Sequence, residues 1–173
     1  SGGVLHFPET WLDMVRPGII LYGVLPDPDA HRTVALRPAL SLISQVVYFK
    51  SVLAGRPVGY GATWAPPADT RVVTVPIGYG DGYPRALSNN GEVLVRGRRR
   101  PIVGRLCMDQ FMVDLGPDGT AYVEDDVVLI GRQGGETIRV EDVARRAGTI
   151  AYEILTRLNE RVPREYPDSP QPG

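Results

Sequence analysis

Short apolar runs separated by glycine and proline are the feature that most restricts the fold of this chain. Six runs rich in β-branched, leucine and aromatic residues follow one another between residues 39 and 130. The 20 glycines and 16 prolines of the 173 residues supply the turns between them. Short strands at turn-separated spacing are typical of an antiparallel β-barrel or sandwich. The runs span residues 39–53, 71–77, 91–97, 102–103, 110–115 and 126–130.

Helical spacing of apolar residues occurs only late in the chain, at residues 140–147 and 150–159. Thr149 is a candidate N-cap for the second helix. The first helix lacks a good cap, because Arg139 stands where Ser or Asp is expected. The pattern therefore predicts a mainly β fold, an antiparallel β-barrel-like domain with two short late helices.

The first 36 residues differ from the rest of the chain. Pro26-Asp27-Pro28-Asp29 cannot continue a regular element, because proline lacks a backbone donor and has a fixed φ. Residues 1–36 are too short to bury a core and look like the end of a preceding domain. We expect the β-domain at residues 37–166 and a disordered tail at residues 167–173.

The composition argues against several kinds of partner and chemistry. A net charge of -1 gives no overall field that would recruit nucleic acid or an anionic membrane, and no apolar run approaches the roughly 20 residues that span a bilayer. Cys107 is the only cysteine, so no disulfide can form within the chain. His6 and His31 have no metal-ligand neighbours at a familiar spacing, so no metal site is expected. The amino terminus has no signal-peptide pattern, which favours a cytoplasmic location.

Two glycine-rich motifs contain tyrosines. In Gly59-Tyr60-Gly61-Ala62-Thr63, glycines on both sides of a tyrosine permit unusual backbone angles and close approach to the ring. Taken alone, this motif favours a core tyrosine in a bulged strand. Gly78-Tyr79-Gly80-Asp81-Gly82 follows a strand, but its spacing is not that of a dinucleotide-binding loop, and no helix follows it. Taken alone, it favours a structural turn.

Two reactive side chains have simple structural interpretations. Cys107, within Gly104-Arg105-Leu106-Cys107-Met108-Asp109-Gln110, has no histidine nearby in the sequence that could activate it. A small buried hydrophobe is the favoured role for it. Lys50 is the only lysine among the 19 basic residues, and its place in a strand run favours a solvated strand position.

In this order and spacing, the motifs resemble those of the carboxy-terminal half of the alanine racemase family. The resemblance runs from about Asp13 to Tyr166, which is nearly the whole chain. Any one motif is weakly specific, whereas five in order are highly specific. The motifs begin at Met14-Val15-Arg16-Pro17-Gly18-Ile19, Gly59, Ile77 and Gly104, and end with Tyr152-Glu153-Ile154 together with Arg161-Val162-Pro163-Arg164.

The resemblance implies an enzyme that uses pyridoxal 5′-phosphate to interconvert L- and D-alanine. Family members join an amino-terminal (β/α)8 barrel to a β-domain and work as homodimers with sites shared between subunits. By resemblance, a barrel lysine outside this chain holds the cofactor and acts on one face of a small amino-acid substrate. Tyr60 is the matching base on the opposite face. Residues 1–36 would be the end of the barrel, and this chain alone would be inactive.

The resemblance also assigns binding residues. Arg16 matches the arginine that donates to the pyridine nitrogen of the cofactor, and Gly18 and Ile19 match positions whose amides bind its phosphate. Met108 matches the residue whose backbone N–H binds the substrate carboxylate. Residues that match the substrate corridor or the dimer contact are Tyr79, Arg85, Arg105 and Asp109.

One position departs from the family pattern and leaves alternatives open. Some relatives carry a phosphate-binding tyrosine where this chain has Glu160, whose carboxylate would repel phosphate, so its side chain is expected to point elsewhere. A broad-specificity or serine racemase of the same scaffold is therefore one alternative. A non-catalytic β-barrel interaction module is another. A decarboxylase domain is less favoured, because the surroundings of Cys107 do not match the cysteine motif of such domains.

Overall fold

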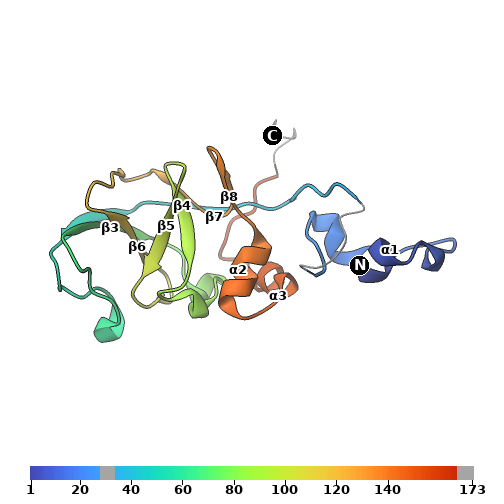
Figure 1. Ribbon diagram of the computed structural model, residues 1–173, viewed down its shortest axis with the longest axis horizontal. Helices are drawn as coiled ribbons and strands as arrows, with labels where there is room; N and C mark the ends of the chain where they lie inside the picture. The colour runs from blue at the N-terminus through green and yellow to red at the C-terminus, as the bar shows by residue number, and fades with distance from the viewer. Residues whose placement is uncertain (28–33, 167–173) are drawn as a thin grey trace.

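The computed structural model describes residues 1–27 and 34–166. A mainly antiparallel sheet with two late helices forms most of the molecule, and a segment of short helical turns extends from one side of it (Figure 1). The predicted β fold with late helices is therefore confirmed. The tail at residues 167–173, expected to be disordered, lies outside the described residues, as does His31.

The sheet contains eight strands in the described part of the chain, paired in the order β1-β7-β4-β5-β6-β3-β2, with β8 paired to β7. Every pairing is antiparallel. The strands are β1 (Leu42–Gln45), β2 (Tyr48–Val52), β3 (Thr70–Val75), β4 (Glu92–Val95), β5 (Arg98–Val103), β6 (Phe111–Gly116), β7 (Asp126–Gln133) and β8 (Glu136–Ile138).

The sheet curls because β1 and β2, which follow each other in the chain, lie at opposite ends of the strand order. β1 pairs with β7, whereas β2 pairs with β3. Between them, Val46 N–H donates to Asp125 O (2.9 Å), and Val47 N–H donates to Thr74 O (3.0 Å). The run expected at residues 39–53 is therefore two strands that serve different ends of the sheet, and the chain between them completes the barrel-like shape.

Two further strand expectations are corrected. β5 begins at Arg98 rather than at residue 102, because pairing with β4 continues back along the hairpin to Arg98. β8 was not expected from the sequence, and it forms as the return strand of a hairpin with β7. In both cases the strand is defined by its partner, since polar residues obscure the apolar alternation.

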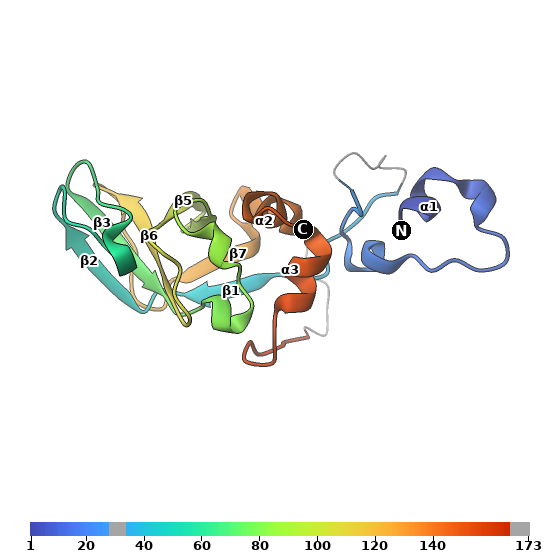
Figure 2. The ribbon, with the colours of Figure 1, turned by 90° about the horizontal axis from the view of Figure 1, so that it is seen from below.

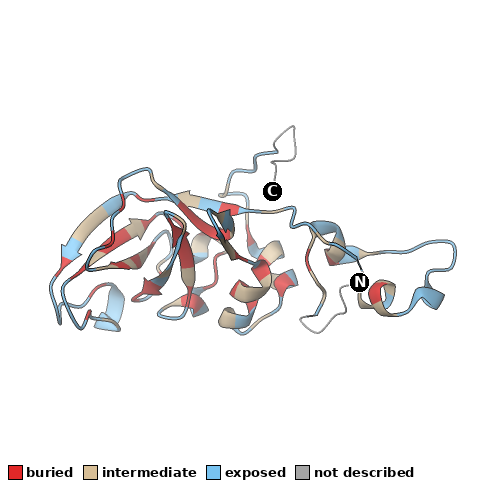
Figure 3. Ribbon diagram, turned by 45° about the horizontal axis from the view of Figure 1, so that its top comes forward, coloured by how far each residue is buried: buried red, intermediate tan, exposed pale blue. Residues whose placement is uncertain are grey.

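The core lies inside the curled sheet and under the helices (Figure 3). β6 shows the clearest alternation, with Phe111, Val113 and Leu115 buried. The helices α2 (Val140–Ala147) and α3 (Ala151–Arg157) add Val143 and Ile154 to the same core. Burying one such side chain contributes about 1.5–3 kcal/mol, so the sheet and the helices stabilise each other.

The helix ends differ in part from expectation. α2 has the expected bounds, and Arg139 makes no side-chain cap; instead Asp142 Oδ2 accepts from Arg139 N–H at 3.2 Å. α3 is shorter than residues 150–159, and its N-cap is Ile150 rather than Thr149. The Thr149 hydroxyl donates to the carboxylate of Glu153, so it is not aimed at the free backbone amides.

The amino-terminal segment projects away from the β-domain (Figure 2). It contains α1 (Gly2–His6) and the 3-10 turns η1 (Pro8–Thr10) and η2 (Gly18–Tyr22). Large apolar side chains are exposed along it, including Leu12, Met14 and Leu21. The assignment of residues 1–36 to a preceding barrel remains a prediction, as do the other domain boundaries. None of the helices described here has the length and apolar character needed to cross a bilayer.

Replacing Tyr83 with phenylalanine is expected to stabilise the fold. The Tyr83 ring is buried and stacked on Phe111, with centroids 5.7 Å apart, and burial raises its pKa although Arg146 opposes the shift. Its hydroxyl has no hydrogen-bond partner among the described residues. Because an unsatisfied buried hydroxyl is costly, Tyr83→Phe should raise the free energy of unfolding by about 1 kcal/mol in urea titrations. The exposed Tyr122→Phe is the control and should change nothing; a less stable Tyr83→Phe protein would refute the expectation.

Candidate functional site

Tyr60 stands on an exposed turn between β2 and β3. It begins the 3-10 turn η3 (Tyr60–Ala62), the small helical turn at the lower left of Figure 1, and is 74% exposed. A bridge between Val58 and Trp64 closes the base of this loop. The reading of the motif as a core tyrosine in a strand is therefore wrong, because positive φ angles at Gly59 (77°) and Gly61 (71°) turn the chain out of the sheet.

The flanking glycines let a second loop pack against the turn. A Cβ added at Gly61 would lie 3.4 Å from Cζ of Arg105, and one at Gly59 would lie 3.0 Å from Cε of Met112. The guanidinium of Arg105 therefore lies against the backbone next to Tyr60. This contact brings a cation to the tyrosine turn from a loop more than 40 residues later in the chain.

The loop that carries Arg105 is joined to the loop that carries Tyr79. Tyr79 N–H donates to Cys107 O (3.1 Å), and Gly80 N–H donates to Met108 O (2.9 Å). The backbones approach so closely that a Cβ at Gly78 would lie 2.2 Å from Met108 O. Met108 and Tyr79 remain partly exposed on this paired unit.

The segment after α3 reaches the same two loops. Arg161 Nε lies 3.2 Å from Asp81 Oδ1, and Arg161 Nη2 lies 2.5 Å from Asp109 Oδ1. Asn159 Nδ2 donates to Gly80 O at 2.7 Å. The hydrogen bond to Asp109 and the charge of Asp81 raise the pKa of Arg161. The sequence motifs include Arg161 but assign no role to it or to Asn159. The one available sequence signal is an acid, Asp81, in a glycine-rich loop.

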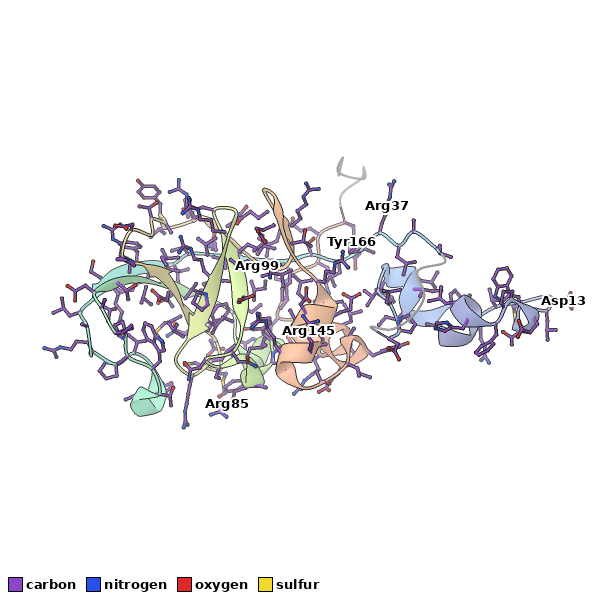
Figure 4. The ribbon with its side chains drawn as sticks, in the orientation of Figure 1. Asp13, Arg37, Arg85, Arg99, Arg145 and Tyr166 are labelled. Carbon is purple, nitrogen blue, oxygen red and sulfur yellow. The ribbon has the colours of Figure 1, made fainter. Side chains whose placement is uncertain are left out.

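Arg85 and Cys107 lie close enough to interact electrostatically. Arg85 is exposed on the 3-10 turn η5 (Arg85–Leu87), on the lower side of the β-domain in Figure 4. Burial raises the pKa of the Cys107 thiol, and the charge of Arg85 partly opposes this shift. Cys107 is only half-buried, which corrects the expectation of a buried hydrophobe: its sulfur faces Arg105 O at 3.4 Å.

The three predicted cofactor residues lie at the other end of the molecule. Arg16 and Gly18 are exposed and Ile19 is buried, at the start of η2 in the amino-terminal segment. Figure 2 shows this segment at one end and the β2–β3 region, from which the Tyr60 turn rises, at the other. The structure thus brings together the six predicted β-domain residues in neighbouring loops but separates them from the three predicted cofactor residues.

Lys50 lies on β2, where it pairs with Val72, and it is half-buried rather than fully solvated. β2 is at the end of the molecule opposite η2 (Figure 2), so Lys50 cannot reach the predicted cofactor residues of its own chain. No group of three His, Cys, Asp or Glu side chains comes together as metal ligands in residues 1–27 and 34–166.

Comparison with known families identifies the β-domain. The family model for the alanine racemase C-terminal domain matches residues 39–166, which is most of the chain. The chain belongs to the alanine racemase family. The predicted family is therefore confirmed, and the chain is a domain of enzymes of this kind.

Individual alanine racemases are similar along nearly the whole chain. The alanine racemase of Cutibacterium acnes is 52% identical over 166 residues, which are 96% of this chain and 44% of that protein. The structure of the Streptomyces coelicolor enzyme gives a TM-score of 0.91 at 43% identity, over 96% of this chain and 44% of that one. The Bartonella henselae enzyme, described with covalently bound pyridoxal phosphate, gives 0.80 at 39% identity, over 89% and 42%. The chain thus spans less than half the length of these alanine racemases.

Proposed function

We propose that this chain supplies part of the active site of a pyridoxal-phosphate-dependent alanine racemase, with Tyr60 as one of its two bases. The observation that carries the proposal is the exposed Tyr60 turn, held against the loop that carries Arg105 and Met108 in a chain of this family. A phenol so exposed, with a guanidinium packed beside its backbone, is available to a substrate presented from outside this chain.

Inversion at a carbon centre explains the need for a base such as Tyr60. A proton must leave one face of the substrate Cα and another must arrive on the opposite face. A single base on one face would return the proton to where it came from. A phenol is a weak base at neutral pH unless cations stabilise its anion. In this chain, Arg105 packs against the backbone at Gly61 and so helps to fix the turn that presents Tyr60.

Pyridoxal phosphate would be held on this chain by Arg16 and by the amides of Gly18 and Ile19. When bound, the cofactor supplies an electron sink that weakens the Cα–H bond. The Ile19 N–H already donates to an oxygen, the Ser1 hydroxyl, at 3.1 Å, so an oxygen ligand fits there. Arg16 is exposed, and because arginine keeps its proton it would hold the pyridine nitrogen without protonating it. The structure described with covalently bound pyridoxal phosphate supports this choice of cofactor.

The separation of Tyr60 from Arg16 supports a site shared between two subunits. Both residues are exposed, and the segments that carry them, the amino-terminal segment and the β2–β3 region, lie at opposite ends of the molecule (Figure 2). One copy therefore cannot present both to one substrate. We propose a homodimer in which Tyr60 of one copy faces the cofactor held by the other, with the second base, a lysine, supplied by an amino-terminal barrel. The cytoplasmic location expected from the sequence stays a prediction.

Met108 and Glu160 bear on the choice of substrate. The Met108 backbone N–H would bind the substrate carboxylate, which makes the substrate a small amino acid. Glu160 is exposed beside Arg161 and favours a second candidate, a racemase that also accepts serine. The relative rates on L-alanine, L-serine and L-lysine distinguish a strict from a broad enzyme.

Adding the lysine-bearing barrel domain to this chain is expected to create racemase activity. The chain alone should show none and should lose pyridoxal phosphate on dialysis, because it lacks the residue that would bind the cofactor covalently. The joined protein should retain the cofactor absorbance and interconvert L- and D-alanine. Cofactor absorbance retained by the dialysed chain alone would contradict the proposal, as would a folded joined protein with cofactor and no racemisation.

A further inference from the structure

We propose that Arg161 is a positioning residue that clamps the loop at residues 78–82 to the loop at residues 104–109 and so sets the place of the Met108 backbone. No role in positioning follows from the family match for this residue. The inference deepens the proposed function and rests on it where it concerns substrate binding, but the clamp itself is a property of this chain alone.

Arg161 is the only described side chain that forms ion pairs with both loops. Its Nε lies 3.2 Å from Asp81 Oδ1 on one loop, and its Nη2 lies 2.5 Å from Asp109 Oδ1 on the other. Its Nη1 occupies the space beside Gly80, where an added Cβ would lie 2.6 Å from it. A planar guanidinium with several donors can serve two carboxylates at once, which a lysine ammonium does less well.

Asp81 gives the clamp a fixed point within the loop. The residue is 8% exposed, and its Oδ2 accepts from Gly78 N–H at 2.8 Å. Its other carboxylate oxygen is the one paired with Arg161. A buried carboxylate that loses its charged partner is costly. Asp81 therefore holds Arg161 firmly, although Arg161 itself is about half exposed.

The backbone after α3 is shaped to deliver Arg161. Arg164 donates to three carbonyls, those of Leu158, Asn159 and Val162, each at 2.7 Å. The Asn159 side chain makes two hydrogen bonds. Its Oδ1 accepts from Arg161 N–H at 3.0 Å, and its Nδ2 donates to Gly80 O at 2.7 Å. The turn that carries Arg161 is thus hydrogen-bonded to the loop at residues 78–82, with which Arg161 also forms an ion pair.

The clamp acts on Met108 through the backbone. Asp109 follows Met108 directly, and Met108 O accepts from Gly80 N–H at 2.9 Å. Arg161 forms ion pairs with the neighbours of both hydrogen-bonded residues, namely Asp81 next to Gly80 and Asp109 next to Met108. Loss of Arg161 would leave Asp81 without its charged partner and so loosen the peptide units around Met108, while β3 and β6 keep their own pairing.

Amide hydrogen exchange of this chain tests the clamp without any activity. In Arg161→Met, we expect the amides of Tyr79 and Gly80 to exchange about tenfold faster, because local opening of their bonds becomes easier. The amides of β3 and β6 should keep their rates. Arg157→Met is the matched control, since the Arg157 side chain pairs with Glu153 on the α3 surface (2.6 Å) and forms no ion pair with either loop. The Arg157 backbone carbonyl packs beside Gly82, and the substitution leaves it in place. Unchanged exchange at Tyr79 and Gly80 would overturn the inference.

Kinetics of the complete enzyme test the consequence for the substrate. We expect Arg161→Met to raise KM for alanine about tenfold while kcat changes less than about threefold, because ground-state binding is loosened. Arg161→Lys should restore part of the affinity, and Asp109→Asn combined with Arg161→Met should add little to either change alone. A fall in kcat with unchanged KM, or an Arg157→Met enzyme with the same defect, would contradict the positioning role.

The two levels of proposal fail in different ways. If the unaltered complete enzyme does not racemise alanine, the proposed function is wrong, and the exchange rates of Tyr79 and Gly80 alone decide whether the clamp exists. If the enzyme is active and Tyr60→Phe inactivates it, while Arg161→Met changes neither KM nor exchange, the function stands and the clamp is refuted.

Discussion

Replacing Tyr60 with phenylalanine is expected to lower alanine racemisation by the complete enzyme about 10³-fold, because one general acid-base group is lost. The equilibrium constant between mirror-image amino acids is one, so kcat/KM must fall equally in both directions. The asymmetry therefore has to be measured at the Cα proton. In D₂O, the enantiomer whose proton faces the lysine should still exchange with solvent, whereas exchange of the other should be lost.

The control for Tyr60→Phe is Tyr48→Phe, another exposed tyrosine on the β-domain, which should leave both rates unchanged. Slowing of exchange to the same extent for both enantiomers would contradict a role on one face only. Unaltered racemisation by Tyr60→Phe would favour the alternative of a non-catalytic β-barrel interaction module, which has no use for the phenol.

Replacing Gly78 with alanine is expected to destabilise the site loops strongly. The new Cβ would lie 2.2 Å from Met108 O and 2.3 Å from Cys107 O, and backbone carbonyls cannot rotate away as a side chain can. The loops would have to separate, which breaks the hydrogen bonds from Tyr79 and Gly80. We expect the free energy of unfolding of this chain to fall by about 3 kcal/mol in denaturant titrations.

Gly135→Ala is the matched control for Gly78→Ala. A Cβ at Gly135 meets nothing within 4 Å, so its effect on unfolding should stay within about 0.5 kcal/mol. In the complete enzyme, Gly78→Ala should also weaken substrate binding, because Met108 moves with the loop. A Gly78→Ala chain as stable as the Gly135→Ala chain would show that the loops are not packed as closely as described.

Local patterns predicted the elements that bury their own apolar face. β6 and α2 were both recognisable, since Phe111, Val113 and Leu115 alternate while Val140, Val143 and Ala144 recur at helical spacing. β8 and the first half of β5 were not, because their pairing partners define them and their side chains are largely polar. Residue type alone favours Thr149 as a cap, whereas its hydroxyl donates to the Glu153 carboxylate.

The motifs of the candidate site could be found in the sequence, but their interactions could not. Glycines around Tyr60 and Tyr79 predicted unusual backbone conformations there, and the order of the motifs indicated the family. Whether Tyr60 was buried in a strand or exposed on a turn depended on the φ angles of Gly59 and Gly61. Arg161 lies 80 residues after Asp81, so no local rule could pair them.

The sequence by itself determined which residue types were available and in what order: short strands with glycine and proline turns, two late helices, and the motifs of an alanine racemase. Only the tertiary structure decided which loops meet, namely those of Tyr60, Gly78 and Met108. It also decided that the amino-terminal segment lies at the end of the molecule opposite the β2–β3 region. The physical reason is distance along the chain. Strand and turn preferences act between neighbouring residues, whereas a site made of several loops depends on how the closed sheet brings distant segments together.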